Sequence, residues 1–321
     1  MVSKARTFLR GRRWWRPLFS VYALFLTACS PVGALNALTP QRDYLLNAAV
    51  AYGPGERGRL DIYRPRGPAM AGQPVVVFLY GGSWNSGRRE DYRFLGEALA
   101  AAGIITVIPD YRLYPEVTYP GFLEDNARAV AWVFAHIGHY GGNPQNIFLM
   151  GHSAGAYNAA MLALDPRWLA AQGLSPSRLR AWIGLAGPYD IYPIGYRNIR
   201  PIFHYPDYPA RSQPIDFAAE GSHIPVFLGA ARHDHLVDPK RNTDGLAREL
   251  QRAGTPVVLR HYTGVGHETL IGAFARPLRW MAPVRRDVLQ FIAETSRVTP
   301  EAASTAAVPA AAKSRDSGSG H

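Results

Sequence analysis

The chain has 321 residues, of which 47% are hydrophobic, so it is long enough for one large α/β domain or two small ones. Its formal charge of +11 does not indicate a nucleic-acid partner: six Lys and Arg residues and no acid lie within residues 1–28, which leaves +5 for the rest. The other basic residues are scattered, which is typical of a solvated surface rather than a nucleic-acid site. A single cysteine excludes an intramolecular disulfide.

Residues 1–28 have the pattern of a secretory signal peptide. The basic residues come first, and an apolar stretch over residues 17–28 follows that is too short to span a bilayer as a helix. Cys29 follows Leu26-Thr27-Ala28, a sequence that resembles the lipobox of bacterial lipoproteins. The resemblance implies lipidation of Cys29 and a lipid-anchored position in the bacterial cell envelope, at the outer membrane, facing the periplasm or the exterior. A plain signal peptide with an incidental cysteine is the alternative.

The next segments begin the folded part. Residues 29–40 are expected to be a lipid-anchored tether, and residues 41–50 a short helix. Residues 59–63 alternate polar and apolar side chains like an edge strand, whereas residues 74–80 form a continuous β-branched and aromatic run, typical of a strand buried on both faces. A helix at 92–102, a strand at 104–108 and a helix at 122–136 follow.

The second half repeats the alternation. A helix ends at Leu164, and the remaining predicted elements are strands at 181–185, 225–230 and 257–261 and helices at 241–253 and 284–295. Strands that alternate with helices predict an α/β fold with a mainly parallel central sheet, helices on both faces, and ligands at the carboxyl ends of the strands. Residues 41–297 would form this domain, with a Tyr- and Pro-rich insert at 187–223 as a small irregular cap and a disordered tail at 298–321.

The central motif is Gly151-His152-Ser153-Ala154-Gly155, which joins an apolar strand to a helix of small residues. This G-x-S-x-G pattern predicts a sharp strand-to-helix turn that exposes the Ser153 hydroxyl as a nucleophile. Taken alone, the motif is also compatible with an ordinary Gly-rich turn.

A serine nucleophile needs a base and an acid that orients the base. In enzymes with such an elbow the chain order is Ser, then Asp or Glu, then His. Asp234 and His267 each follow a predicted strand in this order. Asp238 is the competitor of Asp234, although it could instead cap the following helix. Among the other histidines, His152 should point away from Ser153, and His233, His235 and His261 come too early or sit on a strand.

The loop Tyr80-Gly81-Gly82-Ser83-Trp84 follows the buried strand at 74–80. Its glycines would let the backbone approach a substrate, so the amides of Gly82 and Ser83, with that of Ala154, are the predicted oxyanion hole. A simple Gly-Gly turn is the alternative.

Further segments carry a resemblance to a known family. Asp110-Tyr111-Arg112-Leu113-Tyr114-Pro115-Glu116, Glu124-Asp125 and Tyr140-Gly141-Gly142-Asn143-Pro144, together with the elbow, resemble the α/β-hydrolase superfamily. The similarity covers roughly residues 60–292 and is nearest to the hormone-sensitive-lipase-like, kynurenine-formamidase-like and isoprenylcysteine-methylesterase-like carboxylesterases. Tyr80 replaces the His of many relatives, and Ser83 replaces the third Gly of the lipase-like branch, so no one subfamily is assigned.

These features predict a serine carboxylesterase that needs no metal or cofactor. The expected partners are a small-molecule ester and, through the lipid anchor, a membrane; no nucleic acid is expected, and the oligomeric state is left open. An amidase or formamidase of the same fold, or an inactive lipid-anchored binding protein, is the alternative. Trp84 and Tyr189 are the predicted substrate-binding residues, since aromatic walls would favour short-chain or aryl esters. The other interpretation is that the aromatic rings of the insert merely pack it onto the sheet.

Overall fold

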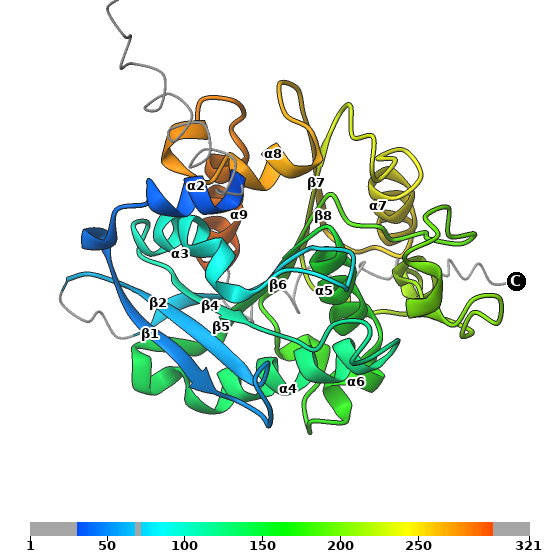
Figure 1. Cartoon of the computed structure of the whole chain (residues 1–321), viewed down its shortest axis with the longest axis horizontal. Coiled ribbons are helices and arrows are strands. Elements are labelled where there is room, and N and C mark those ends of the chain that lie inside the picture. The colour runs from blue at the N-terminus through cyan, green and yellow to red at the C-terminus, as the bar shows by residue number, and fades with distance from the viewer. Residues whose placement is uncertain (1–30, 68–71, 298–321) are drawn as a thin grey trace, which may run out of the picture.

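The computed structural model describes residues 31–67 and 72–297, which contain an eight-stranded sheet with helices on both faces (Figure 1). The strand order is β1-β2-β4-β3-β5-β6-β7-β8. The pairs β1–β2 and β2–β4 are antiparallel, and the other pairs are parallel, which confirms the predicted fold class. The bounds are β1 (Tyr44–Ala51), β2 (Arg59–Pro65), β3 (Gln73–Leu79), β4 (Ile105–Pro109), β5 (Gly142–His152), β6 (Ala181–Leu185), β7 (Val226–Ala231) and β8 (Val257–Tyr262).

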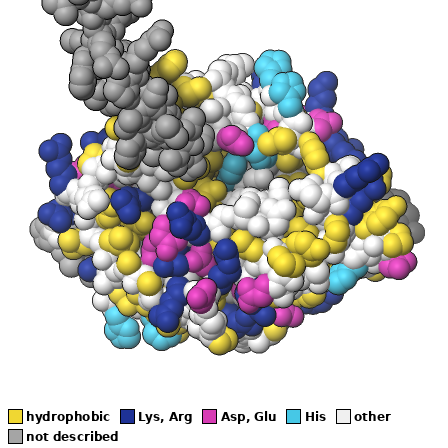
Figure 2. Space-filling view, in the orientation of Figure 1, with side chains coloured by type: hydrophobic (Ala, Val, Ile, Leu, Met, Phe, Trp, Pro, Cys, Tyr) yellow, Lys and Arg dark blue, Asp and Glu magenta, His cyan; other side chains and the backbone are white. Residues whose placement is uncertain are grey.

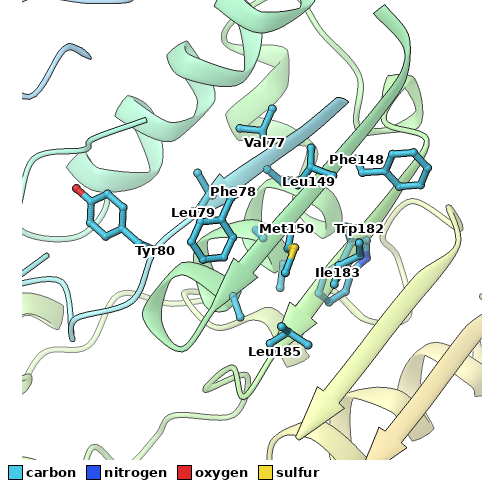
Figure 3. Packing of buried hydrophobic residues seen from close by; sticks show 14 of the residues in the cluster. Val77, Phe78, Leu79, Tyr80, Phe148, Leu149, Met150, Trp182, Ile183 and Leu185 are labelled. Carbon is cyan, nitrogen blue, oxygen red and sulfur yellow. The ribbon is translucent and has the colours of Figure 1, made fainter. Parts of the chain in front are cut away.

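The centre of the sheet is apolar on both faces, as the continuous hydrophobic runs predict. Val77 of β3 pairs with Leu149 of β5, and Leu149 pairs in turn with Trp182 of β6. All three side chains are fully buried, and their neighbours on the same strands pack around them (Figure 3). Each such side chain stabilises the fold by about 1.5–3 kcal/mol relative to exposure. The strands therefore form a rigid base for the loops at their carboxyl ends.

Helices cover the two faces of the sheet in separate groups (Figure 1). Helices α4 (Gly121–His136), α5 (Ala154–Leu164) and α6 (Pro166–Ala170) pack together on one face. On the other face α9 (Val284–Arg297) contacts α3 (Arg93–Ala100), where Arg285 donates to the carbonyl oxygen of Ala98 at 3.1 Å. Helices α7 (Thr243–Arg252) and α8 (His267–Gly272) flank the last two strands. The helices predicted from residue 92 onward are confirmed to within a few residues.

The prediction for the N-terminal part was wrong in three places. Residues 31–37, within the predicted tether, form helix α2 (Pro31–Ala37). Residues 44–51 form strand β1 instead of a helix, because they pair with β2 on both sides of an irregularity between Asn47 and Val50. For the same reason β2 is not an edge strand, since β1 lies outside it. Cys29, the predicted signal peptide and the predicted tail at 298–321 lie outside the described residues.

The insert at 187–223 contains only two short 3-10 helices, η5 (Arg200–Phe203) and η6 (Pro214–Phe217), and is otherwise irregular. Its aromatic residues pack onto the body: the Phe203 ring meets Trp84 edge-on, with centroids 5.0 Å apart, and Tyr157 at 5.6 Å. On the face seen in Figure 2, Lys and Arg side chains are scattered among acidic and hydrophobic ones. Within residues 31–67 and 72–297, no helix has the length and apolar character needed to cross a membrane.

Candidate active site

The turn between β5 and α5 holds Ser153 in a backbone conformation that is rare for a residue with a side chain, with φ 55° and ψ −126°. Such conformations cost about 1–3 kcal/mol and persist only where the surroundings enforce them. Here the enforcement is steric, because a Cβ on Gly155 would lie 2.0 Å from the carbonyl oxygen of Leu79, and one on Gly151 would lie 2.1 Å from that of Gly155. Helix and strands thus approach too closely for any other residue, and the turn projects Ser153 beyond the sheet.

Three side chains from separate loops form a hydrogen-bonded row. The Nε2 atom of His267 lies 2.8 Å from Ser153 Oγ, and its Nδ1 atom lies 2.7 Å from Asp234 Oδ2. His267 is the first residue of α8, shortly after β8, and Asp234 follows β7. An ionised carboxylate can accept a hydrogen bond but cannot donate one, so Nδ1 of His267 must carry the hydrogen. The Nε2 atom is then unprotonated, and its lone pair faces the serine hydroxyl. The row has the geometry needed to take a proton from Ser153.

Asp234 is held as an anion by its surroundings. Burial by itself raises the pKa of its carboxyl, but the hydrogen bond with His267 and those from the backbone amides of Leu236 and Val237, at 2.8 and 2.9 Å, bring the pKa below its ordinary value. The competitor Asp238 has a different place, since its carboxylate accepts from the amide of Lys240 at 2.9 Å in the turn before α7. The structure therefore brings Asp234, and not Asp238, to His267.

His152 lies closer to the site than the sequence indicated. Its ring centroid is 5.0 Å from that of His267, and its Nε2 atom lies 3.0 Å from the carbonyl oxygen of His267, to which it must donate. Burial, and then the nearby charge of protonated His267, lower the pKa of His152 to about 3. A neutral His152 thus supports the backbone of His267. Its place at the last position of β5, directly before the nucleophile, was the only sequence signal of this role.

The loop from Gly81 to Trp84 lies against the nucleophile. A Cβ on Gly81 would be 2.9 Å from the Cβ of Ser153, and both Ser83 and Trp84 have positive φ angles, of 51° and 56°. Gly82, Ser83 and Ala154 line the same cavity as Ser153. The predicted oxyanion-hole residues are therefore grouped around the serine.

Residues of the Asp110-Tyr111 motif stabilise this loop through hydrogen bonds. The Tyr111 hydroxyl donates to the carbonyl oxygen of Tyr80 at 2.7 Å, and the Tyr80 hydroxyl donates to Asp110 Oδ1 at 2.8 Å. Further along, the amide of Tyr114 donates to the carbonyl oxygen of Trp84 at 2.8 Å. All these groups are buried or nearly so, and buried hydrogen bonds of this kind fix geometry because leaving a partner unpaired is costly. Tyr80 is thus a supporting residue, and its role was not predicted.

A cavity of about 1000 Å³ opens above Ser153 and His267. Aliphatic side chains form part of its walls, with Ile191, Ile194 and Ile199 contributed by the insert. The insert therefore overhangs the site, as expected. No group of His, Cys, Asp or Glu side chains that could hold a metal ion is found in the part of the chain that the structure describes.

The predicted aromatic wall is present only in part: Trp84 and, from the insert, Tyr196 line the cavity, but Tyr189 does not. Tyr189 is fully buried, packs edge-on against Trp182 at 6.2 Å, and does not line the cavity. Trp84 reaches the cavity but is only 2% exposed, because its Nε1 donates to Asn158 Oδ1 at 2.9 Å and its ring packs among other aromatics. The alternative interpretation, that these rings pack the insert onto the sheet, is correct for Tyr189, whereas Trp84 both packs against Phe203 of the insert and lines the cavity. The physical reason is that an insert with little regular structure needs its large rings for its own core.

Comparison with known proteins places this architecture among esterases. The BD-FAE family model matches residues 60–199. The chain is 39% identical over 147 residues to a probable isoprenylcysteine alpha-carbonyl methylesterase of Oryza sativa subsp. japonica, covering 44% of this chain and 35% of that protein. It is 32% identical over 251 residues to LipM, a probable carboxylic ester hydrolase of Mycobacterium tuberculosis, covering 72% of this chain and 58% of that protein. The chain thus spans only part of the length of these relatives.

Solved structures agree on the fold. Esterase B from Lactobacillus rhamnosis superposes with a TM-score of 0.71 at 16% identity, over 89% of this chain and 97% of that one. Esterase 2 from Thermogutta terrifontis superposes with a TM-score of 0.67 at 21% identity, over 81% and 98%. With the elbow, the Ser–His–Asp row and the mainly parallel sheet, these matches lead to one conclusion. The chain has the α/β-hydrolase fold, and its sequence is similar to carboxylesterases over part of their length.

Proposed function

We propose that the protein is a serine esterase that cleaves carboxylic esters through an acyl-enzyme. Ser153 Oγ would attack the ester carbonyl carbon while His267 Nε2 takes its proton and passes it to the leaving alcohol. Water would then attack the acyl-enzyme, again with His267 as the base, and release the acid. Asp234 would keep the imidazole oriented and stabilise the imidazolium. The observation that carries the proposal is the hydrogen-bonded row from Asp234 through His267 to Ser153, at 2.7 and 2.8 Å.

The negative charge that develops on the carbonyl oxygen needs donors fixed in advance. We assign this role to the backbone amides of Gly82, Ser83 and Ala154, which lie around Ser153 in the same cavity. One such donor is worth about 10²–10³-fold in kcat in other serine hydrolases. A backbone donor cannot be removed by changing its own side chain, so the loop is best tested through the groups that hold it.

The decisive experiment compares the wild type with Ser153→Ala. The wild type should hydrolyse p-nitrophenyl acetate and be labelled by a fluorophosphonate probe, and the variant should do neither. Ser177, an exposed serine near α6, offers the matched control Ser177→Ala, which should behave as the wild type. A wild-type protein that stays unlabelled would instead support the lipid-anchored binding protein, and an active Ser153→Ala variant would refute the assignment of the nucleophile.

For the substrate we retain the preference for short-chain or aryl esters, but on different grounds from the aromatic wall. Two proteins of this fold have been solved with short acyl groups: Esterase B inhibited by a C4-C4 tributyrin phosphonate, and the Thermogutta esterase with butyrate bound. A series of p-nitrophenyl esters from acetate to palmitate tests the proposal. Rates should peak at short chains, and a steady rise up to palmitate would contradict it.

We also propose that Cys29 is lipidated after removal of residues 1–28, which would anchor the protein in the cell envelope. More than one acyl chain is needed for firm anchoring, and the lipoprotein type of modification would supply several. Cys29→Ser should shift the protein from the membrane to the soluble fraction. The signal peptide must be shown to be cleaved in the variant, and a cleaved variant that stays with the membrane would disprove lipidation.

A further inference from the structure

Helix α2 is attached to the domain although it lies outside the sheet, beside α3 and the segment around α8 (Figure 1). Its anchor is Asn36, whose Nδ2 donates to the carbonyl oxygen of Glu90 at 2.8 Å and whose Oδ1 accepts from the amide of Phe94 at 3.3 Å. Thr39, just after the helix, is buried and donates to the carbonyl oxygen of Leu35 at 2.8 Å. The helix therefore has a fixed position on the protein.

One side of α2 faces the catalytic cavity. Val32 and Leu35 are three residues apart, so they lie on the same face of the helix, and both line the cavity that contains Ser153 and His267. Leu38 points elsewhere, since it is 65% exposed and does not line the cavity. The half-buried state of Val32 and Leu35 thus results from the cavity wall that they form.

The wall continues into residues of the main domain. Phe94 of α3, Ile271 of α8 and Leu278 line the cavity together with the α2 residues. The insert supplies a second aliphatic wall from Ile191, Ile194 and Ile199. The cavity that holds the nucleophile is therefore lined by apolar side chains from two separate parts of the chain.

The charges of the cavity restrict the substrate further. Its lining contains four carboxylates and one guanidinium, from Asp91, Asp190, Asp238, Glu268 and Arg241. The guanidinium is already paired, since Arg241 contacts Asp190 at 2.9 Å. Asp91 is paired as well, with Arg88 at 3.1 Å, so the excess of negative charge that an anionic ester would meet comes from Asp238 and Glu268. An uncharged ester would not be repelled by these carboxylates.

We infer that helix α2 is a specificity wall: Val32 and Leu35 contact the apolar acyl or alcohol group of an uncharged ester substrate. The inference rests on the proposed esterase function and adds to it the class of substrate and the residues that select it. A hydrophobic pocket distinguishes substrates by roughly 10–200-fold for each methylene group that it buries. A substitution of Val32 or Leu35 should therefore alter the preference of the enzyme for the chain length of the ester.

Two series of substrates identify which group lies on the wall. In one, the acyl chain of a p-nitrophenyl ester grows from acetyl to hexanoyl; in the other, the alcohol of an acetate ester grows from ethyl to hexyl. Val32→Ser and Leu35→Ser should each lower kcat/KM for the longer members relative to the shortest about ten-fold or more in one series. Val32→Phe, which fills the space, should also reject the longer members. Leu38→Ser is the matched control on the same segment and should keep the wild-type profile.

The outcomes separate this inference from the proposed function. Melting temperatures within a few degrees of the wild type show that the variants are folded, and Val32→Phe gives an independent test if the serine variants are not. Wild-type chain-length profiles in all three wall variants, in both series, would overturn the inference and leave the esterase function standing. An equal change in Leu38→Ser would overturn it as well. A wild-type protein that hydrolyses none of the esters would refute the proposed function itself.

Discussion

The buried histidine beside the nucleophile provides a quantitative test of the site's electrostatics. The perturbation is His152→Gln, because a glutamine amide nitrogen can occupy the place of Nε2 and still donate to the carbonyl oxygen of His267. The substitution removes the titration and keeps the hydrogen bond. In the wild type, burial and then the charge of His267 lower the pKa of His152 from its ordinary value of 6.5 to about 3.

The sign of the effect follows from where the proton binds. Between pH 6.5 and pH 3 the unfolded chain protonates His152 and the native protein does not, so the unfolded state binds one proton more. The free energy of unfolding therefore falls as the pH falls, by up to about 1.4 kcal/mol per pH unit. Summed from pH 7 to pH 5, this contribution is roughly 2 kcal/mol, and it levels off only near pH 3.

Urea denaturation at pH 7, 6 and 5 measures this pH dependence of the free energy of unfolding. His152→Gln should lose about 2 kcal/mol less stability than the wild type between pH 7 and pH 5. The exposed His233 supplies a matched control, because His233→Gln should follow the wild-type pH dependence. If the wild type and His152→Gln lost equal amounts of unfolding free energy between pH 7 and pH 5, the view that His152 is buried in its neutral form would be refuted.

Three further predictions test other parts of the site. Asp234→Asn should lower kcat about 10⁴-fold with an unchanged circular dichroism spectrum, because the amide would favour the wrong tautomer of the histidine; a loss under ten-fold would contradict the role of Asp234. Tyr111→Phe should reduce the free energy of unfolding by about 1–3 kcal/mol, since the buried carbonyl oxygen of Tyr80 would lose its donor, and should also lower kcat; unchanged kinetics would show that the loop needs no such support. The mono-p-nitrophenyl ester of succinic acid should react at least about ten-fold more slowly than p-nitrophenyl butyrate, and added salt should narrow the gap, because four carboxylates line the cavity; equal rates would contradict this selection.

Local patterns were sufficient to predict the sheet's centre and the nucleophile. Continuous apolar runs make up most of β3, residues 147–150 of β5, and β6, and a strand segment buried on both faces is expected to have such a sequence. The turn at Ser153 is equally local, since a Cβ on Gly151 would lie 2.1 Å from the carbonyl oxygen of Gly155, four residues further along the chain. Asp234 and His267 could be proposed because each follows a strand whose carboxyl end lies at the same edge of the sheet.

Other features depend on contacts between residues far apart in the chain. The segment Tyr44–Ala51 is rich in Leu and Ala, which suit a helix, and it is a strand only because β2 offers its backbone as a partner. No local pattern shows that Asn36 would anchor α2 to the carbonyl of Glu90, 54 residues away, and so place Val32 and Leu35 beside the nucleophile.

The identity of the residues that line the cavity also depends on contacts between residues far apart in the chain. The sequence indicated that the insert is aromatic and lies near Ser153, but an aromatic ring can either line a cavity or fill a core, and its neighbours in sequence do not distinguish these. Tyr189 packs on Trp182 away from the cavity, whereas Tyr196 and isoleucines of the insert line the cavity. Motif chemistry is set by residues close together in the chain, but which side chains meet a substrate is set by how the whole chain packs.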